Sequence, residues 1–378
     1  RTVFISGAQA SELFYDTSKF SRKDAMPAIV KNVLLGESGV QGLDGKEHLH
    51  RKQMFMNIMT RRSIDRLASV FEDELQSRAT QWVGRSAVCI FDEMCSALTR
   101  SVCHWAGVNL EASSSSQVTQ DLTAMFNEVG TIGWGHLKAR KARKRGNRWA
   151  AGKIEQIRSN GRDGADESDW TPAELIAFHQ DRQGNRLAVD VAAVELLNIL
   201  RPTVAISVYI TLGLHALQQF PEAKSDSVTD DDELRCLVQE IRRFYPFFPL
   251  VAARTSKSFD WNGWHFPEKQ LVLLDIYGTN HDSRIWHEPE RFKPSRFIER
   301  KGGSHDFIPQ GGGQFSENHR CAGEWITIRL MQVALRFFME KLSYRVPEQD
   351  LSIDMSSLPA LPASGFVISD VKLDSRHV

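Results

Sequence analysis

One stretch of the chain combines residue types that can do chemistry: the segment 309–325, with the sequence PQGGGQFSENHRCAGEW. Apolar residues spaced three and four apart follow Cys321, which predicts a helix beginning just after this thiol. The free N–H groups and the dipole of a helix N-terminus favour a thiolate. Such a thiolate can attack as a nucleophile, form a disulfide or bind a metal, and a buried structural cysteine is the alternative. Three glycines, Gly311–Gly313, allow the backbone to approach a flat partner closely.

Charged residues also occur at spacings that predict contact. Glu240 and Arg243 are three apart, on one face of a predicted helix over residues 231–245. By itself this spacing is equally typical of an ordinary surface pair. Downstream, the sequence FKPSRF ends at Phe297 and contains Arg296, 25 positions before Cys321.

The longest predicted helix runs from Asp190 to Gln219. Thirty residues at 1.5 Å rise would span about 45 Å, the width of a sizeable domain. The segment is apolar enough to raise the question of a membrane span, but it contains Asn198, Arg201, Pro202 and His215. We therefore expect a buried central helix and no transmembrane segment.

The remaining pattern is mostly helical. We expect a strand at Val3–Ser6 with a helix from Ala8, a loop over 26–45, a helix from Lys46, and two helices within 61–110. Ser113–Ser116 is read as a polar break. Short strands are expected over 250–275, irregular chain over 285–300, and strands and turns from Tyr344. No internal repeat or linker divides the chain, so one domain over 1–378 is expected.

The bulk composition narrows the class of protein. Formal net charge is zero over 378 residues, so no global field favours nucleic acid. Five cysteines form neither a CxxC pair nor a zinc spacing, which predicts reduced thiols and a cytoplasmic protein. The chain begins within a predicted strand and without Met, so we expect that the start of the protein is missing.

A basic run occupies residues 138–148. It contains seven cations: Lys138, Arg140, Lys141, Arg143, Lys144, Arg145 and Arg148. A membrane-facing patch, a nucleic-acid patch and a guide for acidic ligands are possible functions, and a solvated helix end is the simplest interpretation.

The ordered set Glu-x-x-Arg, Phe-x-Pro-x-Arg-Phe and His-Arg-Cys-x-Gly resembles the cytochrome P-450 superfamily. The resemblance implies a mostly α fold, the cytochrome P-450 fold, with small β-sheets and a haem b between the central helix and the cysteine helix. It implies that Cys321 is the metal ligand, the axial thiolate. It also implies a buried triad of Glu240, Arg243 and Arg296, rather than Arg291 of the neighbouring Pro-Glu-Arg-Phe.

Two departures from the superfamily pattern point to one branch. The central helix reads Arg201-Pro202 where the superfamily carries an acid–Thr pair that relays protons to dioxygen. Arginine cannot give up a proton at working pH, and proline has neither hydroxyl nor N–H. The cysteine loop carries Gln314 and Glu317 in place of the usual Phe and Gly. With the QGLDG, YGTNHD and LPASGFV segments, these features resemble the fatty-acid peroxygenase branch, from residue 1 to about 370.

This resemblance implies that the carboxylate of a long-chain fatty acid binds Arg201, and that hydrogen peroxide is the oxidant without an obligatory reductase. An internal salt bridge to Arg201 is the alternative. Gln41 corresponds to a distal residue that is His in some decarboxylating relatives. Because Gln cannot titrate, hydroxylation at the alpha or beta carbon is expected, although a Gln41 that only caps loop backbone is possible. Leu35 stands where relatives often carry Phe.

Further site residues follow from family position alone. Haem propionate contacts are expected from His48, Lys52, Arg254 and His319, with Arg51 as a substitute for Lys52, although each could be an ordinary surface residue. The acyl tunnel is expected along Ala205 and the segment 246–252, which includes Leu250. A dioxygen-dependent monooxygenase with redox partners and a non-catalytic haem or fatty-acid carrier are the rival interpretations.

Overall fold

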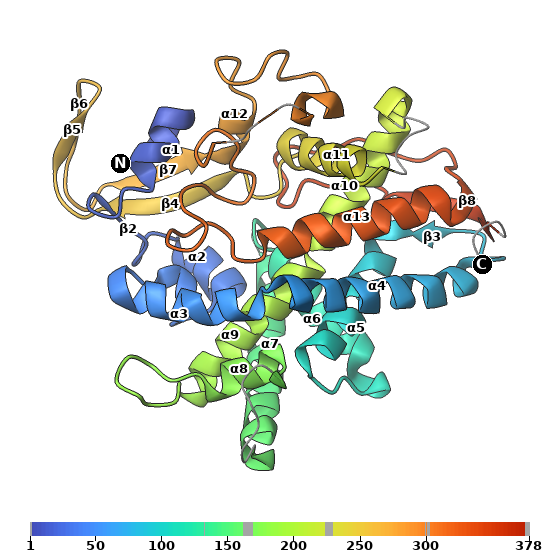
Figure 1. Ribbon diagram of the computed structural model, residues 1–378, viewed down its shortest axis with the longest axis horizontal. Coiled ribbons are helices and arrows are strands. Elements are labelled where there is room, and N and C mark those ends of the chain that lie inside the picture. The colour runs from blue at the N-terminus through green and yellow to red at the C-terminus, as the bar shows by residue number, and fades with distance from the viewer. Residues whose placement is uncertain are drawn as a thin grey trace.

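Helices make up most of the protein, and the larger sheet lies to one side of them (Figure 1). The computed structural model describes residues 2–131, 133–161, 169–223, 230–298, 300 and 303–374. The α-helices are α1 (Ala8–Phe14), α2 (Ala28–Val30), α3 (Gly45–Ile58), α4 (Arg61–Trp82), α5 (Ile90–Ala106), α6 (Ala112–Asn127), α7 (Trp134–Asn160), α8 (Pro172–Phe178), α9 (Val189–Val204), α10 (Ile206–Gln219), α11 (Asp231–Phe244), α12 (Ile276–Asn280) and α13 (Glu324–Glu340). The short helical turns are η1 (Lys31–Leu35), η2 (Val40–Gly42), η4 (Pro221–Ala223) and η5 (Pro294–Phe297).

The larger sheet has the strand order β1-β7-β4-β2. Its strands are β1 (Thr2–Ser6), β2 (Phe20–Ser21), β4 (Leu250–Thr255) and β7 (Leu271–Asp275), and only the β1–β7 pair is parallel. A second sheet joins β3 (Val88–Cys89), β9 (Val367–Leu373) and β8 (Leu342–Arg345), and β5 (Phe259–Trp261) pairs with β6 (Trp264–Phe266). The mostly helical class with small sheets is therefore confirmed.

The expected central helix is present but divided. Helices α9 and α10 meet at Ala205, one turn after Pro202. Proline cannot donate the backbone hydrogen bond to the residue four before it, and its ring crowds that carbonyl, so an interruption here has a direct cause. By length and composition, the segment Val189–Gln219 could cross a membrane, but 89% of its most apolar window is buried inside the protein. Burial of this kind is typical of a core helix.

Most of the predicted elements are confirmed, but the loop expected over 26–45 contains the short helical segments α2, η1 and η2. The expected break at Ser113–Ser116 is wrong, because these serines form the first turn of α6. Val118, Leu122 and Met125 continue the helix at spacings of three and four and are buried. The predicted polar break therefore marks a helix N-terminus, where serine is well tolerated.

Helix α7 holds the whole basic run and packs against both α6 and α9 (Figure 1). The run thus lies in the first half of a helix of 27 residues, not at a solvated helix end. Helix α9 carries Arg201, α11 carries the Glu240–Arg243 pair, and α13 follows Cys321. The fold therefore places these groups around one part of the core.

Candidate active site

The cysteine loop is held by its own backbone. The N–H of Cys321 donates to the carbonyl of Gln310 at 3.0 Å, and α13 begins three residues later. A Cβ added at Gly313, whose φ is +82°, would lie 2.5 Å from Oδ1 of Asn318, and one at Gly312 would lie 2.9 Å from the carbonyl oxygen of Ser304. These glycines therefore allow the loop to fold on itself. Their role in the approach of a flat partner stays a prediction.

The thiol of Cys321 is not a thiolate by its position alone. Burial raises its pKa, and this effect exceeds the opposing effects of the Gly323 N–H and of the cations Lys52 and Arg242. The N–H of Gly323 at the helix N-terminus lowers the pKa of Cys321, as expected, but burial outweighs this effect. Coordination by a metal ion deprotonates a thiol outright, so a bound metal would supply the missing stabilisation.

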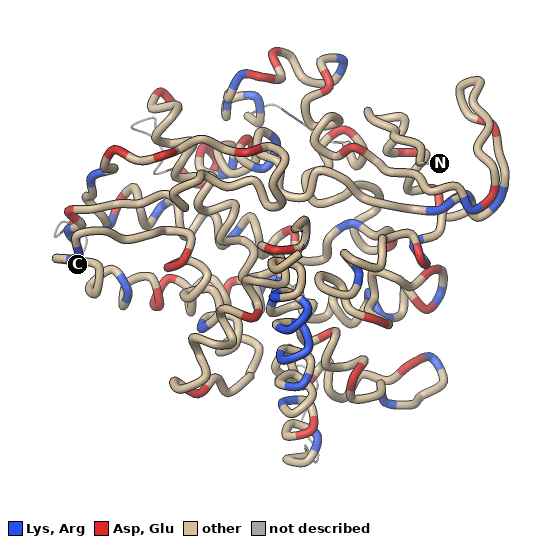
Figure 2. The backbone as a smooth tube through the Cα atoms, turned by 180° about the vertical axis from the view of Figure 1, so that it is seen from behind, with Lys and Arg blue, Asp and Glu red and all other residues tan. Residues whose placement is uncertain are grey.

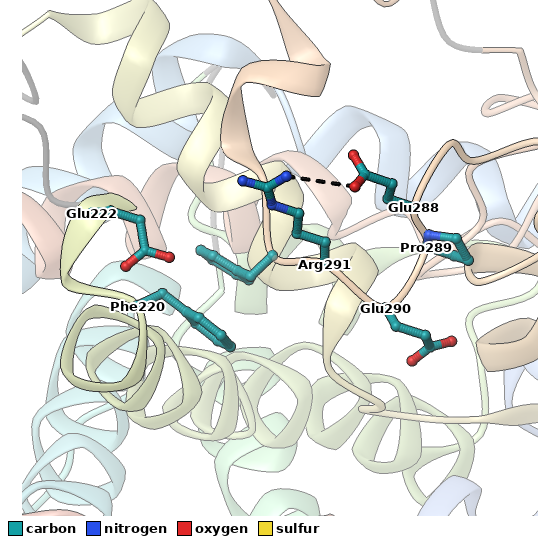
Figure 3. Close-up of a pocket in the computed structure, with 7 residues that line it drawn as sticks. Phe220, Glu222, Glu288, Pro289, Glu290 and Arg291 are labelled. Atoms are coloured by element: carbon teal, nitrogen blue, oxygen red, sulfur yellow. Dashed lines mark hydrogen bonds and ion pairs between the residues drawn. The ribbon is translucent and has the colours of Figure 1, made fainter.

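The predicted triad is confirmed by its contacts. Arg243 binds the carboxylate of Glu240 in a bidentate manner. Its Nε lies 2.7 Å from Oε2, and its Nη2 lies 2.9 Å from Oε1. Arg296 Nε lies 3.1 Å from the same carboxylate. Arg291 is outside the triad: its side chain turns to Glu288 at 3.5 Å, in a surface pocket of about 570 Å³ (Figure 3). Arg291 contributes only its carbonyl, which accepts from both triad arginines.

A second ion-pair network behind the thiol was not predicted. Glu324, the first residue of α13, accepts from Nη2 of Arg242 at 2.6 Å and from Nε of Arg320 at 2.6 Å. Arg242 also donates to Oε1 of Gln310 at 2.9 Å, the residue whose carbonyl holds Cys321. The arginines hold the pKa of Glu324 below its usual value against the effect of burial. The signal in the sequence was an acid directly after the cysteine turn and a second arginine beside Arg243.

On the other side, Arg201 projects from α9 into a buried environment without a partner. Only 5% of its surface is exposed, and Nη1 is a fully buried donor without an acceptor. Within the described ranges, no residue accepts a hydrogen bond from the Arg201 side chain or forms a salt bridge with it. Burial, and secondarily the nearby Arg143 charge, lowers the pKa of Arg201 to about 9. The alternative of an internal salt bridge therefore finds no carboxylate in the described structure.

The carboxylate of Glu195 lies one to two turns from Arg201 on α9, but it forms its hydrogen bonds with other residues. Oε1 of Glu195 accepts from Nη1 of Arg51 at 2.6 Å and from the N–H of Val40 at 3.0 Å. Its Oε2 accepts from Asn198 Nδ2 at 2.8 Å. The suggestion that Arg51 could replace Lys52 at a propionate is corrected by this pair, in which Arg51 ties α3 to the buried acid.

Gln41 is joined to α9 through Asn198. The Nδ2 of Asn198 donates to Oε1 of Gln41 at 3.2 Å, while its own Oδ1 is buried without a partner. The loop residue Gln41 thus contacts α9 at Asn198, one helical turn before Arg201. The alternative, that it caps loop backbone, is not supported by this side-chain contact.

A second buried guanidinium, Arg143 of α7, holds the segment that carries Leu35. Its Nη1 donates to the carbonyl of Leu34 at 3.0 Å, its Nη2 to that of Leu35 at 3.5 Å, and its Nε to Oδ1 of Asn147 at 2.8 Å. At Gly36, where φ is +80°, an added Cβ would lie 2.0 Å from Nη2. The basic run of the sequence concealed this residue among surface cations.

Four basic side chains lie together beside the cysteine loop. The rings of His48 and His319 stack with centroids 3.8 Å apart, and Nζ of Lys52 donates to the carbonyls of Asn318 and, at 3.0 Å, Arg320. Burial, and then Lys52, lowers the pKa of His48 to about 4, and burial lowers that of Lys52 to about 8. Burial, Arg22, His48 and Lys52 hold the pKa of His319 well below its usual value.

Arg22, which the sequence did not indicate, is the fourth member of this group. Its guanidinium lies 4.3 Å from the Phe14 ring centroid and donates to the carbonyl of Ala252 at 2.8 Å. Arg254 does not join the group: it donates to the carbonyls of Asp24 at 2.8 Å and Lys269 at 3.1 Å. These two bonds use Nε and Nη1 of its guanidinium, and contact of Arg254 with a haem propionate stays a prediction.

The two expected tunnel residues lie at element ends. Ala205 is buried between α9 and α10, and its N–H donates to the carbonyl of Arg201 at 3.0 Å. Leu250 begins β4 with 39% of its surface exposed. Their contact with an acyl chain stays a prediction.

The residues present fit a haem. The described residues contain no group of three or more His, Cys, Asp or Glu side chains that could hold a metal ion by themselves. Cys321 would accordingly be a single protein ligand. The buried side chains of Arg22, His48, Lys52 and His319 would donate hydrogen bonds to two propionates, and Arg22 and Lys52 would supply the positive charge. Among the described residues, only the carboxylate of Asp44, 4.0 Å from His319 Nε2, lies within ion-pair distance of this group.

Comparison with known proteins agrees with this geometry. The sequence model of the cytochrome P450 family matches residues 225–368. The structure of cytochrome P450SP alpha (CYP152B1) in complex with (R)-ibuprophen is 46% identical, covers 98% of this chain and 90% of that chain, and superposes with a TM-score of 0.94. Cytochrome P450EX alpha (CYP152N1) with myristic acid is 42% identical, covers 99% and 90%, and also has a TM-score of 0.94.

Curated relatives match more distantly. Cytochrome P450 71B24 of Arabidopsis thaliana is 28% identical over 144 residues. That match spans 37% of this chain and 28% of the length of the plant protein.

Proposed function

Because this chain belongs to the CYP152 family of cytochromes P450, the fatty-acid peroxygenase branch, we propose that it hydroxylates long-chain fatty acids at the alpha or beta carbon with hydrogen peroxide. The observation that carries the proposal is the buried guanidinium of Arg201, whose Nη1 has no acceptor. An isolated buried charge costs several kcal/mol, which an anionic ligand would offset. A fatty-acid carboxylate matches the planar fork of arginine and can bind it in a bidentate manner.

In this mechanism the substrate supplies the acid–base group that the protein lacks. The carboxylate held by Arg201 moves a proton between the two oxygens of hydrogen peroxide. The α9 side chains around it cannot do this, because Pro202 has no hydroxyl and the hydroxyl of Thr203 donates to the carbonyl of Ile199 at 2.8 Å. When bound, haem b with Cys321 as its axial ligand supplies the oxidising chemistry.

The loop residues fix the approach of the acyl chain. Gln41 is held by Asn198 and cannot titrate, which supports hydroxylation over release of carbon dioxide. Leu35, whose carbonyl accepts from Arg143, would border the carbons next to the carboxylate and so influence the choice between the alpha and beta positions.

The test is turnover of a long-chain acid by the haem-loaded protein. We expect product with hydrogen peroxide alone, no gain from a reductase with dioxygen, and loss of turnover in Arg201→Ala. A normal rate in Arg201→Ala would contradict the carboxylate mechanism. Turnover only with reductant and dioxygen would favour a monooxygenase, and tight acid binding without turnover would favour a carrier.

A further inference from the structure

The outward face of α7 carries a stripe of cations that the proposed reaction does not use. Residues 134, 137, 138, 141, 144, 145 and 148 follow one another at steps of one or three, so they share one face of the helix. The opposite face is buried and contains Ala139, Ala142, Arg143, Gly146 and Ala150. Of the seven cations in the basic run, therefore, only Arg143 lies on the buried face.

Several cations of this basic run form no ion pair with a described residue, and the helix begins with exposed apolar side chains. Lys138 pairs with Glu128 at 3.5 Å, and Arg145 pairs with Asp121. No described residue forms a salt bridge with the other four cations of the run, Arg140, Lys141, Lys144 and Arg148, all of which are exposed. Figure 2 shows basic residues following one another along this helix at the centre of the rear face. At the start of the helix, Trp134 is 86% exposed and Leu137 is 40% exposed.

This combination matches the chemistry of an anionic bilayer surface. Lysine and arginine are attracted to acidic lipid headgroups, and their long stems reach the interface. An exposed tryptophan with a leucine one turn later can enter the boundary between headgroups and acyl chains. Nucleic acid would engage the cations but would leave Leu137 without an apolar partner, and the zero net charge of the chain gives no wider basic surface for a duplex.

We propose that the outward face of α7, from Trp134 to Arg148, binds the surface of an anionic lipid membrane. The inner face of the same helix packs on α9, which carries Arg201. Binding would therefore hold the site close to a bilayer in which long-chain fatty acids partition. This benefit rests on the proposed function, whereas the binding itself does not.

Flotation of the haem-loaded protein with vesicles tests the proposal. We expect binding to vesicles of phosphatidylglycerol and phosphatidylcholine in equal parts, little binding to phosphatidylcholine alone, and weakening with added salt. Replacing Arg140, Lys141, Lys144 and Arg148 together by Gln should lower the partition coefficient about fivefold per cation removed. Trp134→Ser should lower it about tenfold at high and low salt alike.

A matched control removes the same charge elsewhere. The exposed cations Arg61, Lys257, Lys269 and Lys372 are changed together to Gln, and this variant should bind vesicles like the wild type. Peroxide-driven turnover of a dissolved acid should be unchanged in both quadruple variants, which establishes that they fold. The double variant Lys141→Glu/Lys144→Glu changes the charge by the same four units with two substitutions and should weaken vesicle binding to a similar extent. The proposal would be overturned if the wild type did not bind the vesicles, or if the control variant lost as much vesicle binding as the α7 variant. It would also be overturned if the wild type bound a duplex oligonucleotide more tightly than the vesicles and Trp134→Ser did not change that binding.

Discussion

The two sides of the cysteine helix treat buried charge in opposite ways. On the α11 side, four arginines have carboxylate partners: Arg243 and Arg296 on Glu240, and Arg242 and Arg320 on Glu324. On the α9 side, Arg201 donates to no described residue, and Arg143 donates only to neutral oxygens.

The difference separates charges that serve the fold from a charge that serves binding. A buried ion pair with complete hydrogen bonding is self-contained, so it stabilises the loop and helix that it joins. A buried guanidinium without an acceptor lowers stability until an anion arrives. A carboxylate that binds Arg201 removes the free-energy cost of burying this unpaired charge, and the removal of that cost strengthens the binding.

The largest effect is expected where a paired charge loses its partner. Glu240→Gln leaves Arg243 and Arg296 buried without a carboxylate, and the free energy of unfolding should fall by about 3–5 kcal/mol in urea titrations. The control, Glu290→Gln, removes an exposed acid nearby and should stay within about 0.5 kcal/mol of the wild type. A loss below about 1 kcal/mol at Glu240 would show that the triad does not depend on its charge.

A smaller loss of folding stability is expected when Arg143 is replaced. Arg143→Met removes three donated hydrogen bonds and frees the carbonyls of Leu34 and Leu35, so stability should fall by about 1–3 kcal/mol. The ratio of alpha- to beta-hydroxylated product should change as well, since Leu35 is no longer held. Arg148→Met, on the exposed face of the same helix, should change neither. If Arg143→Met leaves both stability and product ratio intact, Arg143 does not position this segment.

Removing the unpaired charge should act in the opposite direction to Glu240→Gln. Without ligand, Arg201→Met should be as stable as the wild type or more stable by about 1 kcal/mol, because a desolvated cation is replaced by an apolar side chain of similar length. Urea unfolding of the ligand-free protein measures this. A loss of stability above about 1 kcal/mol would reveal a partner for Arg201.

The smallest effect concerns pH. The pKa of His48 is about 4, below its ordinary 6.5, because the ring is buried and faces Lys52 and Arg22. A lowered pKa contributes stability that is complete above about pH 6.5 and is lost as pH falls through about 4. The melting temperature of haem-free protein should accordingly fall less between pH 7 and 4.5 in His48→Gln than in the wild type. His265→Gln, at an exposed position, should follow the wild type; equal slopes for all three proteins would contradict the assignment.

Sequence patterns predicted the parts of the site that are local or carried by motifs. Glu240 and Arg243 are one helical turn apart, and the Phe-x-Pro-x-Arg-Phe register selected Arg296 over Arg291, as their contacts confirm. Arg201 could be predicted as an unusual buried cation, since it lies within the long apolar segment Val189–Gln219.

The missed residues depend on contacts between distant segments. Arg143 meets Leu34 across 109 positions, Glu195 meets Arg51 across 144, and Arg22 meets Ala252 across 230. The helical spacing of Ala139, Ala142, Gly146 and Ala150 places Arg143 on the buried face of α7, a signal that the basic run concealed. Burial also outweighed the expected effect of the helix N-terminus on the pKa of Cys321, because desolvation is a property of the packed structure and not of the helix terminus alone.

The most direct test of the central claim compares two ligands of equal chain length in the haem-loaded wild type and in Arg201→Met. Dissociation constants for tetradecanoic acid and tetradecanol isolate the contribution of the carboxylate. The wild type should bind the acid roughly 10- to 150-fold more tightly than the alcohol, as expected for hydrogen bonds to a charged group. In Arg201→Met this preference should vanish, with the two constants nearly equal. A preference for the acid that survives in Arg201→Met would show that the carboxylate binds elsewhere, and would contradict the account.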